Sequence, residues 1–382
     1  MNPVSFEVRM TSCSSLVPLA SIGLRRRSLL LGLMGLAGLP LPVLAAAPNL
    51  DPLTHAAAMH VRATTSVVLA LGRAGNRLVA VGERGTILLS DDDGQAWRQV
   101  PSPVSVSLTG VSFGDDQHGW IVGHGQVVLT TSDAGQTWTR QLDGTQVAQI
   151  ELTSAKASGD AGLIRTAERL VEEGADKPFL DVHFFNATHG LIVGAYGSIL
   201  ATDDGGKTWR SRRADVPNPG SRHLYRIHVR QQGSDQAVWI AGEQGLLFRA
   251  PDATAAFTPV PTPYKGSFFG LASTKTALLV HGLRGNLWRS ADDGATWAQI
   301  AMPAPVTLTA ATVLTDGSVV LVDEAGKLLR STDDGASFTQ VSLAKAAAFT
   351  DVLPGRDGAA ILASARGPFA VTPGTPGKTT TP

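Results

Sequence analysis

The sequence predicts an all-β protein, a seven-bladed β-propeller with a short helical insert between blades 2 and 3. Two recurring patterns support this. The first is an eight-residue motif, Ser/Thr-x-Asp-x-Gly-x-Thr/Ser-Trp, whose final aromatic recurs at spacings of 41, 71, 48, 40 and 41 residues. The second is a Gly-x-x-Gly turn followed by an apolar strand, which precedes the motif. A period near 41 residues with room for four short strands is typical of a propeller blade.

The motif, which we call the box, has residue types that suit a hairpin turn. Its carboxylate can accept hydrogen bonds from turn amides, and its hydroxyl adds another. Its glycine adopts positive φ at little cost, and its aromatic ring is expected to be buried between neighbouring sheets. We interpret the acids as structural, because one active site does not need five copies. The predicted structural residues are Asp92, Gly94, Trp97, Asp133, Gly135, Trp138, Asp204, Gly206, Trp209, Asp292, Gly294, Trp297, Asp333, Gly335 and Phe338; a worn copy ends at Phe257.

The strand after the Gly-x-x-Gly turn sets the number of blades. It occurs seven times, the last time from Pro368 to Thr372 with no box after it. Seven such strands and six boxes predict seven blades, the last incomplete, over residues 66–372. A length of 382 residues would allow two or three domains, but a propeller closes on itself as one.

Residues 1–45 have the pattern of an export signal. Arg25–Arg27 precede the apolar run Ser28–Leu39, which is too short to span a bilayer comfortably, and Ala45–Ala47 offer small residues for cleavage. The alternative is an uncleaved anchor. The pattern Arg-Arg-Ser-Leu-Leu resembles a twin-arginine signal, although three basic residues also suit the general secretory route. We therefore expect a periplasmic or secreted protein.

Two further segments flank the predicted ring. Residues 46–65 contain no box; a strand within residues 50–62 would complete blade 7 and close the ring, and the alternative is a disordered tether. The tail, residues 373–382, is rich in Pro, Gly and Thr and is predicted to be disordered. The only cysteine, Cys13, lies in the leader, so the remaining chain has no thiol for a disulfide or a metal site.

Residues 143–177 interrupt the repeat with a helical pattern. Asp160 is expected to cap a helix and Gly174 to end it. A shorter, weaker helix is expected before it. The insert is either an amphipathic flap on the ring or a docking element for a partner. The apolar residues that share one helical face are Leu163, Ile164, Ala167, Leu170 and Val171.

An arginine-rich stretch follows the third box and is the candidate patch for an anionic partner surface; the alternative is a solvated face. The chain as a whole has 32 basic and 32 acidic residues, and four of those basic residues but only one acid lie in the leader. This balance gives no reason to expect nucleic-acid binding. The candidate binding residues are Arg210, Arg212, Arg213, Arg222, Arg226 and Arg230.

These features together resemble the photosystem II stability/assembly factor family of BNR (Asp-box) propellers, in particular its bacterial members. The resemblance covers about residues 66–372. It implies an exported, non-catalytic scaffold or assembly factor for a membrane protein complex, monomeric, peripheral to the membrane and without a cofactor. The arginine patch of the photosynthetic members cannot be matched residue by residue, so the stretch Arg210–Arg230 is an analogue only.

Two other functions use the same repeat. A sialidase-like glycoside hydrolase resembles a six-bladed ring with three arginines and a Tyr–Glu nucleophile pair. This chain has only Tyr196, Tyr225 and Tyr264, and no Tyr and Glu placed together on inner strands. A lectin-like carbohydrate binder is the third possibility. His118 and His189 occupy equivalent repeat turns, which favours turn residues over zinc ligands, and we predict no metal site.

Overall fold

Strands dominate the part of the chain that the structure describes, residues 51–232 and 235–374. These residues belong to one compact unit of this computed structural model. The predicted export signal, with Arg25–Arg27 and Cys13, lies outside the described residues, as does most of the tail 373–382.

The strands form seven antiparallel sheets in chain order, which are the blades. Blade 1 contains β1 (Val68–Ala74), β2 (Arg77–Gly82), β3 (Ile87–Ser90) and β4 (Arg98–Val100); blade 2 contains β5 (Leu108–Phe113), β6 (Gly119–Gly123), β7 (Val128–Thr131) and β8 (Thr139–Leu142). Blade 3 contains β9 (Phe179–Phe184), β10 (Gly190–Gly194), β11 (Ile199–Thr202) and β12 (Arg210–Ser211); blade 4 contains β13 (Leu224–Gln232), β14 (Asp235–Gly242), β15 (Leu247–Ala250) and β16 (Thr258–Pro259). Blade 5 contains β17 (Phe268–Ser273), β18 (Leu278–Gly282), β19 (Leu287–Ser290) and β20 (Ala298–Ile300). Blade 6 contains β21 (Leu308–Val313), β22 (Val319–Asp323), β23 (Leu328–Ser331) and β24 (Thr339–Val341); blade 7 contains β25 (Phe349–Pro354), β26 (Ala360–Ser364) and β27 (Phe369–Val371).

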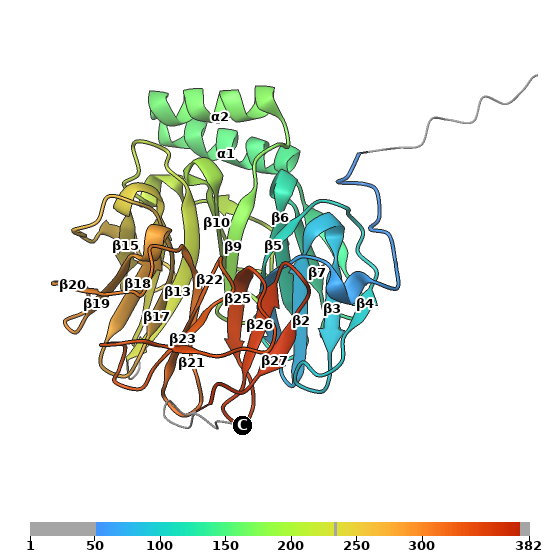
Figure 1. Ribbon diagram of the computed structural model, residues 1–382. Coiled ribbons are helices and arrows are strands. Elements are labelled where there is room, and N and C mark those ends of the chain that lie inside the picture. Colours follow the sequence, from blue (N-terminus) through green and yellow to red (C-terminus); the bar gives the residue numbers. More distant parts are fainter. Residues whose placement is uncertain (1–50, 233–234, 375–382) are drawn as a thin grey trace, which may run out of the picture. The chain divides into compact units, whose positions relative to one another are not determined.

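The blades close into a ring (Figure 1). The first strand of each blade contacts the first strand of the next, and β25 contacts β1. Six blades have four strands and blade 7 has three. The predicted seven-bladed propeller is therefore confirmed. Because successive strands are antiparallel, the Gly-x-x-Gly turns and the links between blades lie on one face, the turn face, and the boxes lie on the opposite face, the box face.

The hydrophobic core lies between adjacent blades, and each box aromatic packs against the preceding blade. Trp138 of blade 2, for example, packs with Val79 and Val100 of blade 1. Trp138, Trp209 and Phe257 are buried, whereas Trp97, Trp297 and Phe338 are only half-buried. The aromatics thus contribute unequally to the contacts between blades.

One hydrogen-bond pattern builds the box turns. In blade 1 the Ser90 hydroxyl donates to Asp92 Oδ1 at 2.8 Å and accepts from the Gly94 amide at 2.9 Å. Asp92 Oδ1 also accepts from the amides of Gln95 and Ala96, at 3.1 and 2.9 Å. Gly94 has φ of 90°, which is why glycine stands there. The carboxylate of the box therefore makes its hydrogen bonds within its own turn.

These turn bonds predict a specific loss of stability in acid. Hydrogen bonds, led by those from the hydroxyls of Thr296 and Ser337, lower the pKa values of Asp292 and Asp333 from the ordinary 3.8 to about 2. A carboxyl group whose pKa is depressed by folding stabilises the fold above its unfolded pKa, and this contribution is lost as pH falls through the folded pKa. We expect Tm to fall steeply between about pH 4 and pH 2. Circular dichroism melts across this range measure it, and an unchanged Tm at pH 2 would contradict the assignment.

The helical insert lies between β8 of blade 2 and β9 of blade 3, as predicted, and appears at the top of Figure 1. It consists of α1 (Gly144–Ser158) and α2 (Ala161–Glu173), which pack on one another. Asp143 and Gln146 form a capping box on α1, and Asp160 accepts hydrogen bonds from the first amides of α2.

The expectation that the first helix is the shorter one is wrong, whereas its apolar pattern is the weaker one, as expected. α1 has 15 residues and α2 has 13. Val147 of α1 enters the core cluster between blades 2 and 3, and the buried Glu151 accepts a 2.8 Å hydrogen bond from Ser211 of β12. α1 is specified by its cap and by these contacts with the ring rather than by a long apolar stripe.

The strand considered for residues 50–62 is absent from the described part of that segment. Residues 51–62 run along blades 1 and 2 instead: the Ala57 amide donates to the Ser102 carbonyl, and the Ser105 amide to the Pro52 carbonyl. Ring closure therefore depends on contacts between blades 7 and 1, which we call the seam. Asp351 accepts from the Leu71 amide at 3.0 Å, and the Thr350 hydroxyl donates to the Val68 carbonyl at 2.6 Å.

Candidate functional site

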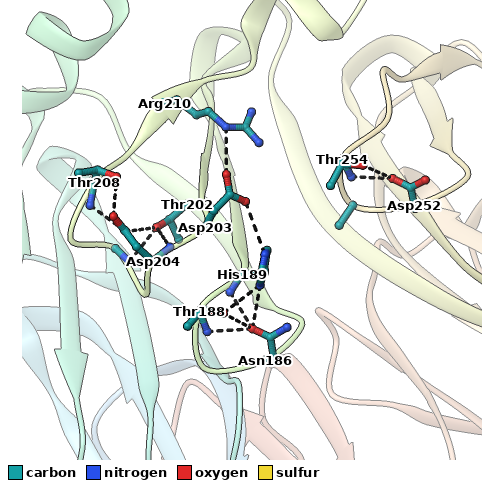
Figure 2. A network of polar contacts seen from close by, with 12 residues as sticks. Asn186, Thr188, His189, Thr202, Asp203, Asp204, Thr208, Arg210, Asp252 and Thr254 are labelled. Atoms are coloured by element: carbon teal, nitrogen blue, oxygen red, sulfur yellow. Dashed lines mark hydrogen bonds and ion pairs between the residues drawn. The ribbon is translucent and has the colours of Figure 1, made fainter.

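The six arginines between 210 and 230 do not form one patch. Arg210 lies on β12 toward the box face and pairs with Asp203 at 3.4 Å (Figure 2). Arg230 lies farther along β13, is buried, and pairs with Asp293 of blade 5 at 2.6 Å. The sequence brings these side chains close along the chain, but the strands carry them to different parts of the ring.

Arg212 does not belong to a surface patch, because only 1% of the residue is exposed. Its Nε donates to Asp215 at 2.7 Å, and its Nη atoms donate to the carbonyls of Ala253, Thr254 and Ala255 at 2.6 to 3.1 Å. These carbonyls belong to the worn box of blade 4, which has lost its glycine and its Ser/Thr. The guanidinium group of Arg212 therefore holds a turn that the box can no longer hold by itself.

Arg226 spans the central channel. From β13 of blade 4 its guanidinium lies 3.6 Å from Asp181 of blade 3 and 3.4 Å from Asp351 of blade 7. Burial raises the pKa of Asp181 to about 6, although the charge of Arg226 opposes this. Asp181 also accepts the Ile227 amide at 2.8 Å. Arg226 thus joins blades across the channel rather than presenting a charge to a partner.

The remaining two candidates, Arg213 and Arg222, lie on the turn face. Arg213 adjoins a groove of about 940 Å³ between α2 and the loop of residues 213–221. Its Nε lies 3.3 Å from Glu151 of α1, and its Nη1 donates to the Tyr196 carbonyl at 2.7 Å. Arg222 is half-buried beside a separate pocket of about 500 Å³. The groove is larger than the pocket beside Arg222.

The groove has one cationic wall and one apolar wall. The cationic wall comes from α2, where Arg165 and Arg169 are exposed. Arg169 pairs with Glu173 at 2.5 Å, whereas the Arg165 side chain has no hydrogen bond or ion pair with the described residues. The only carboxylate on the groove, Asp160, is used by the amides of Gly162 and Leu163. The apolar wall consists of Ala214, Val216, Pro217 and Pro219.

An exposed aromatic, Tyr196, lies next to Arg213 on the turn face, outside the lining of the groove. Tyr196 is 48% exposed, and its ring lies 5.0 Å from that of His223 and 5.3 Å from Lys177 Nζ. Its φ of 54° is shared by the equivalent Arg84, Gln244 and Arg284, so the backbone conformation belongs to the repeat. The position of the exposed ring is specific to this blade.

Sequence reasoning missed Arg165 and Arg169. They stand four residues apart on the second helix, so they share a face by helical periodicity. The sequence pattern indicates the apolar face of that helix, and these two arginines lie on the opposite face. The signal was therefore present, although nothing in the sequence showed that the loop of residues 213–221 would form the other wall.

The acids that the repeat supplies are used within turns (Figure 2). In blade 3 Asp204 accepts from the Thr208 amide at 2.9 Å, and Asn186 accepts from the amides of Thr188 and His189 at 2.8 Å. In the worn box Asp252 accepts from the Thr254 amide at 2.7 Å. Among the described residues no group of three or more His, Cys, Asp or Glu could hold a metal ion.

Tyr225 and Tyr264 do not have the environment of a nucleophile. Burial, with the charge of Glu243, raises the pKa of Tyr225, and burial raises that of Tyr264. A tyrosine nucleophile needs the opposite shift or an adjacent base. The Tyr264 hydroxyl instead donates to the Leu283 carbonyl at 3.1 Å.

Comparison with known proteins identifies the same repeat. The family model described as photosynthesis system II assembly factor YCF48 matches residues 95–177 and 165–266. The photosystem II assembly lipoprotein Ycf48 of Synechococcus sp. (strain CC9902) is 32% identical over 154 residues, which is 38% of this chain and 44% of that protein. The match thus spans less than half the length of this curated relative.

Solved structures show the fold. A structure of YCF48 bound to D1 peptide has a TM-score of 0.60 at 18% identity and covers 84% of this chain and 97% of that one. Streptogramin B lyase, an enzyme, has a TM-score of 0.61 at 14% identity, covering 80% and 93%. The ring alone therefore does not distinguish a binding protein from an enzyme. The chain is thus a seven-bladed propeller built from BNR/Asp-box repeats, and its residues 95–266 are similar to the photosystem II assembly factor family.

Proposed function

We propose that the protein is an exported, non-catalytic propeller that binds a subunit of a membrane protein complex and assists its assembly or stability. The observation that carries this proposal is the groove between α2 and the loop of residues 213–221, which adds a built binding surface to the repeat. The related Ycf48 proteins are named photosystem II assembly lipoproteins, and one YCF48 structure contains a D1 peptide. By analogy we propose a peptide segment of a membrane protein as the ligand here.

The groove chemistry supports recognition of a protein segment. Arginine binds carboxylates in a bidentate geometry and stacks on aromatic rings, and it is enriched at protein interfaces. Arg165 has no intramolecular partner among the described residues to compete with a ligand. The Pro-rich wall offers rigid apolar surface that loses little conformational entropy on binding. We propose that acidic or carboxylate-bearing segments bind here, with Tyr196 contacting their apolar side chains.

No helix in the described part of the chain is long and apolar enough to cross a membrane. The proposed location, periplasmic or secreted and peripheral to the membrane as a monomer, rests on the export pattern of residues 1–45.

The proposal against catalysis rests on how the acids are used. Figure 2 shows carboxylates that accept hydrogen bonds from their own turns, which leaves them poor candidates for the paired acid and base of a glycosidase. Hydrolysis of a sialoside or another glycoside by the purified protein, abolished by one carboxylate substitution, would overturn the non-catalytic assignment.

The double variant Arg165→Glu with Arg169→Glu tests the groove. We expect it to lose capture of the membrane-complex subunit, because it reverses the charge of the cationic wall, while Tm stays within a few degrees since both side chains are exposed. The measurement is a pull-down from a detergent-solubilised membrane fraction, with bound subunits identified by mass spectrometry.

The matched control is Arg210→Glu, which also reverses an exposed arginine but lies toward the box face. It should retain capture. Equal capture by the wild type and the double variant would move the binding site away from the groove. The triple change Arg212→Glu, Arg213→Glu and Arg226→Glu would be uninformative, because Arg212 is buried and Arg226 spans the channel.

A further inference from the structure

Blade 7 has an open position where every other blade has a fourth strand. In blades 1 to 6 the third strand pairs with a fourth, whereas the described residues provide no strand beside β27. All four residues of β3 and of β23 are buried. All three residues of β27 are only half-buried. The three residues of β27 are thus more exposed than those of β3 and β23, while Pro368 just before β27 is buried and β19 of blade 5 also has two half-buried residues.

The register of the sheet identifies the backbone groups on the open edge of β27. Ala370 pairs with Ile361 as Leu89 pairs with Val79, which makes Pro368 the equivalent of Ile87. At that position in complete blades the carbonyl accepts from the fourth strand: Ile199 accepts from the Arg212 amide at 3.0 Å, and Leu247 from the Val260 amide at 2.8 Å.

The corresponding groups of blade 7 are therefore the Pro368 carbonyl and both backbone groups of Ala370. Within residues 51–232 and 235–374 no hydrogen bond from a fourth strand reaches them. An unpaired strand edge of this kind is a template for another strand.

The described residues nearest the two ends, 51–62 and 373–374, do not supply the missing strand. Residues 51–62 are engaged with blades 1 and 2. After β27 the carbonyls of Pro373 and Gly374 accept hydrogen bonds of 3.1 and 3.0 Å from Arg330 of blade 6.

The sequence after β27 also lacks a box. Val371, Pro373 and Thr375 stand where a box has Ser/Thr, Asp and Gly, and Lys378 stands where it has its aromatic. In the other blades the Ser/Thr and Asp side chains of the box form the turn that leads into the fourth strand. This sequence lacks those side chains, so it cannot form the same turn.

We propose that the edge of β27 is a binding site for an extended segment of a partner protein, which adds to blade 7 as its fourth strand. Main-chain hydrogen bonds to Pro368 and Ala370 supply affinity, and side-chain positions supply specificity. This site is on the ring's outer strand edge and is separate from the groove beside α2, so it does not depend on the function proposed above.

The fourth strands of the other blades indicate which partner segment would fit beside β27. In blades 1, 4, 5 and 6 they place an aromatic residue three positions before an aliphatic one, as in Trp97 and Val100, whereas blades 2 and 3 have Gln141 and Arg212 at the second position. The aromatic packs against the preceding blade. The expected partner segment is therefore extended, antiparallel to β27, and carries Trp or Phe followed three residues later by Val or Ile.

A peptide with the sequence of residues 95–102 tests the proposal, since it reproduces the fourth strand of blade 1. Labelled with fluorescein and titrated with the full chain, it should bind saturably by fluorescence anisotropy. N-methylation at its valine removes the amide that donates to the Pro368 carbonyl and should weaken binding at least tenfold. N-methylation at the glutamine that corresponds to Gln99, whose amide points away from the edge, is the matched control and should not weaken binding.

The protein supplies a second pair of variants. Ala370→Pro removes the edge amide and should lose the peptide, whereas Ala370→Gly keeps that amide and should bind it. Hydrogen exchange of residues 366–374 should slow when the peptide is added. The double variant Arg165→Glu with Arg169→Glu should bind this peptide as the wild type does, which separates this site from the groove.

Four results would overturn the proposal. The first is the absence of saturable binding, and the second is an equal loss with both N-methylated peptides. The third is tighter binding after truncation at Gly374, which would show that the chain's own tail occupies the edge. The fourth is a dimer in light scattering that Ala370→Pro converts to a monomer, because a second copy would then be the occupant.

Discussion

Replacement of Arg212 by Met is expected to lower the free energy of unfolding by about 1.5–3 kcal/mol, the range for hydrogen bonds to a charged group, because the Asp215 side chain is 40% exposed and keeps its hydration. The side chain is fully covered, and its loss leaves three carbonyls of the blade 4 turn and the Asp215 carboxylate without their donor. Methionine preserves most of the aliphatic volume, so the loss measures the guanidinium group. Urea unfolding followed by tryptophan fluorescence gives the value.

Arg212→Lys is the informative control. It keeps the charge but cannot donate to three carbonyls and a carboxylate at once, so we expect most of the stability to be lost here as well. A lysine variant as stable as the wild type would mean that charge alone holds the turn. A methionine variant within about 1 kcal/mol of the wild type would refute the structural role of Arg212, because surface substitutions fall in that range.

Trp138→Ala is the second change with a large expected effect, about 3–5 kcal/mol, as for other large-to-small core substitutions. The ring is 6% exposed, lies edge-on to Phe113 at 6.2 Å, and packs into the core between blades 1 and 2. Its indole N–H also donates to the Gly135 carbonyl at 2.9 Å. Both the packing and this hydrogen bond disappear in the variant.

Trp297→Ala provides the comparison, because Trp297 occupies the same box position but is half-buried and its Nε1 has no hydrogen-bond partner in the described residues. It should cost clearly less than Trp138→Ala under the same conditions. Equal losses at both positions would show that the box aromatic contributes through its own turn rather than through burial against the preceding blade.

The repeat made the ring predictable. A box such as Ser90–Trp97 encodes its own turn through local hydrogen bonds, and local chemistry is what a sequence pattern records. The seven blades and the insert followed from counting these units. The role of Arg212 could not follow, because its partners at residues 253–255 are forty positions away and the worn box gives no sign of what compensates for it.

The candidate site was predictable only in part. The insert was recognised as the feature that a bare propeller does not need, and one wall of the groove belongs to it. The arginines between residues 210 and 230 were predicted to form one patch, but residues that are close in the sequence of a propeller can point to different parts of the ring. Arg226 and Arg230 lie on one strand, yet the first pairs with Asp351 across the channel and the second with Asp293 of blade 5.

The seam between blades 7 and 1 has a kinetic consequence. Its bonds join residues about 280 positions apart, as between Leu71 and Asp351 and between Val68 and Thr350. Contacts so distant in sequence require most of the chain to be ordered before they form, since the entropy of closing a long loop precedes any gain. Because no strand within residues 51–232 and 235–374 is shared between the two ends of the ring, these side-chain bonds and the packing around them close it. The seam should therefore be the last contact made during refolding and the first one broken when the ring opens.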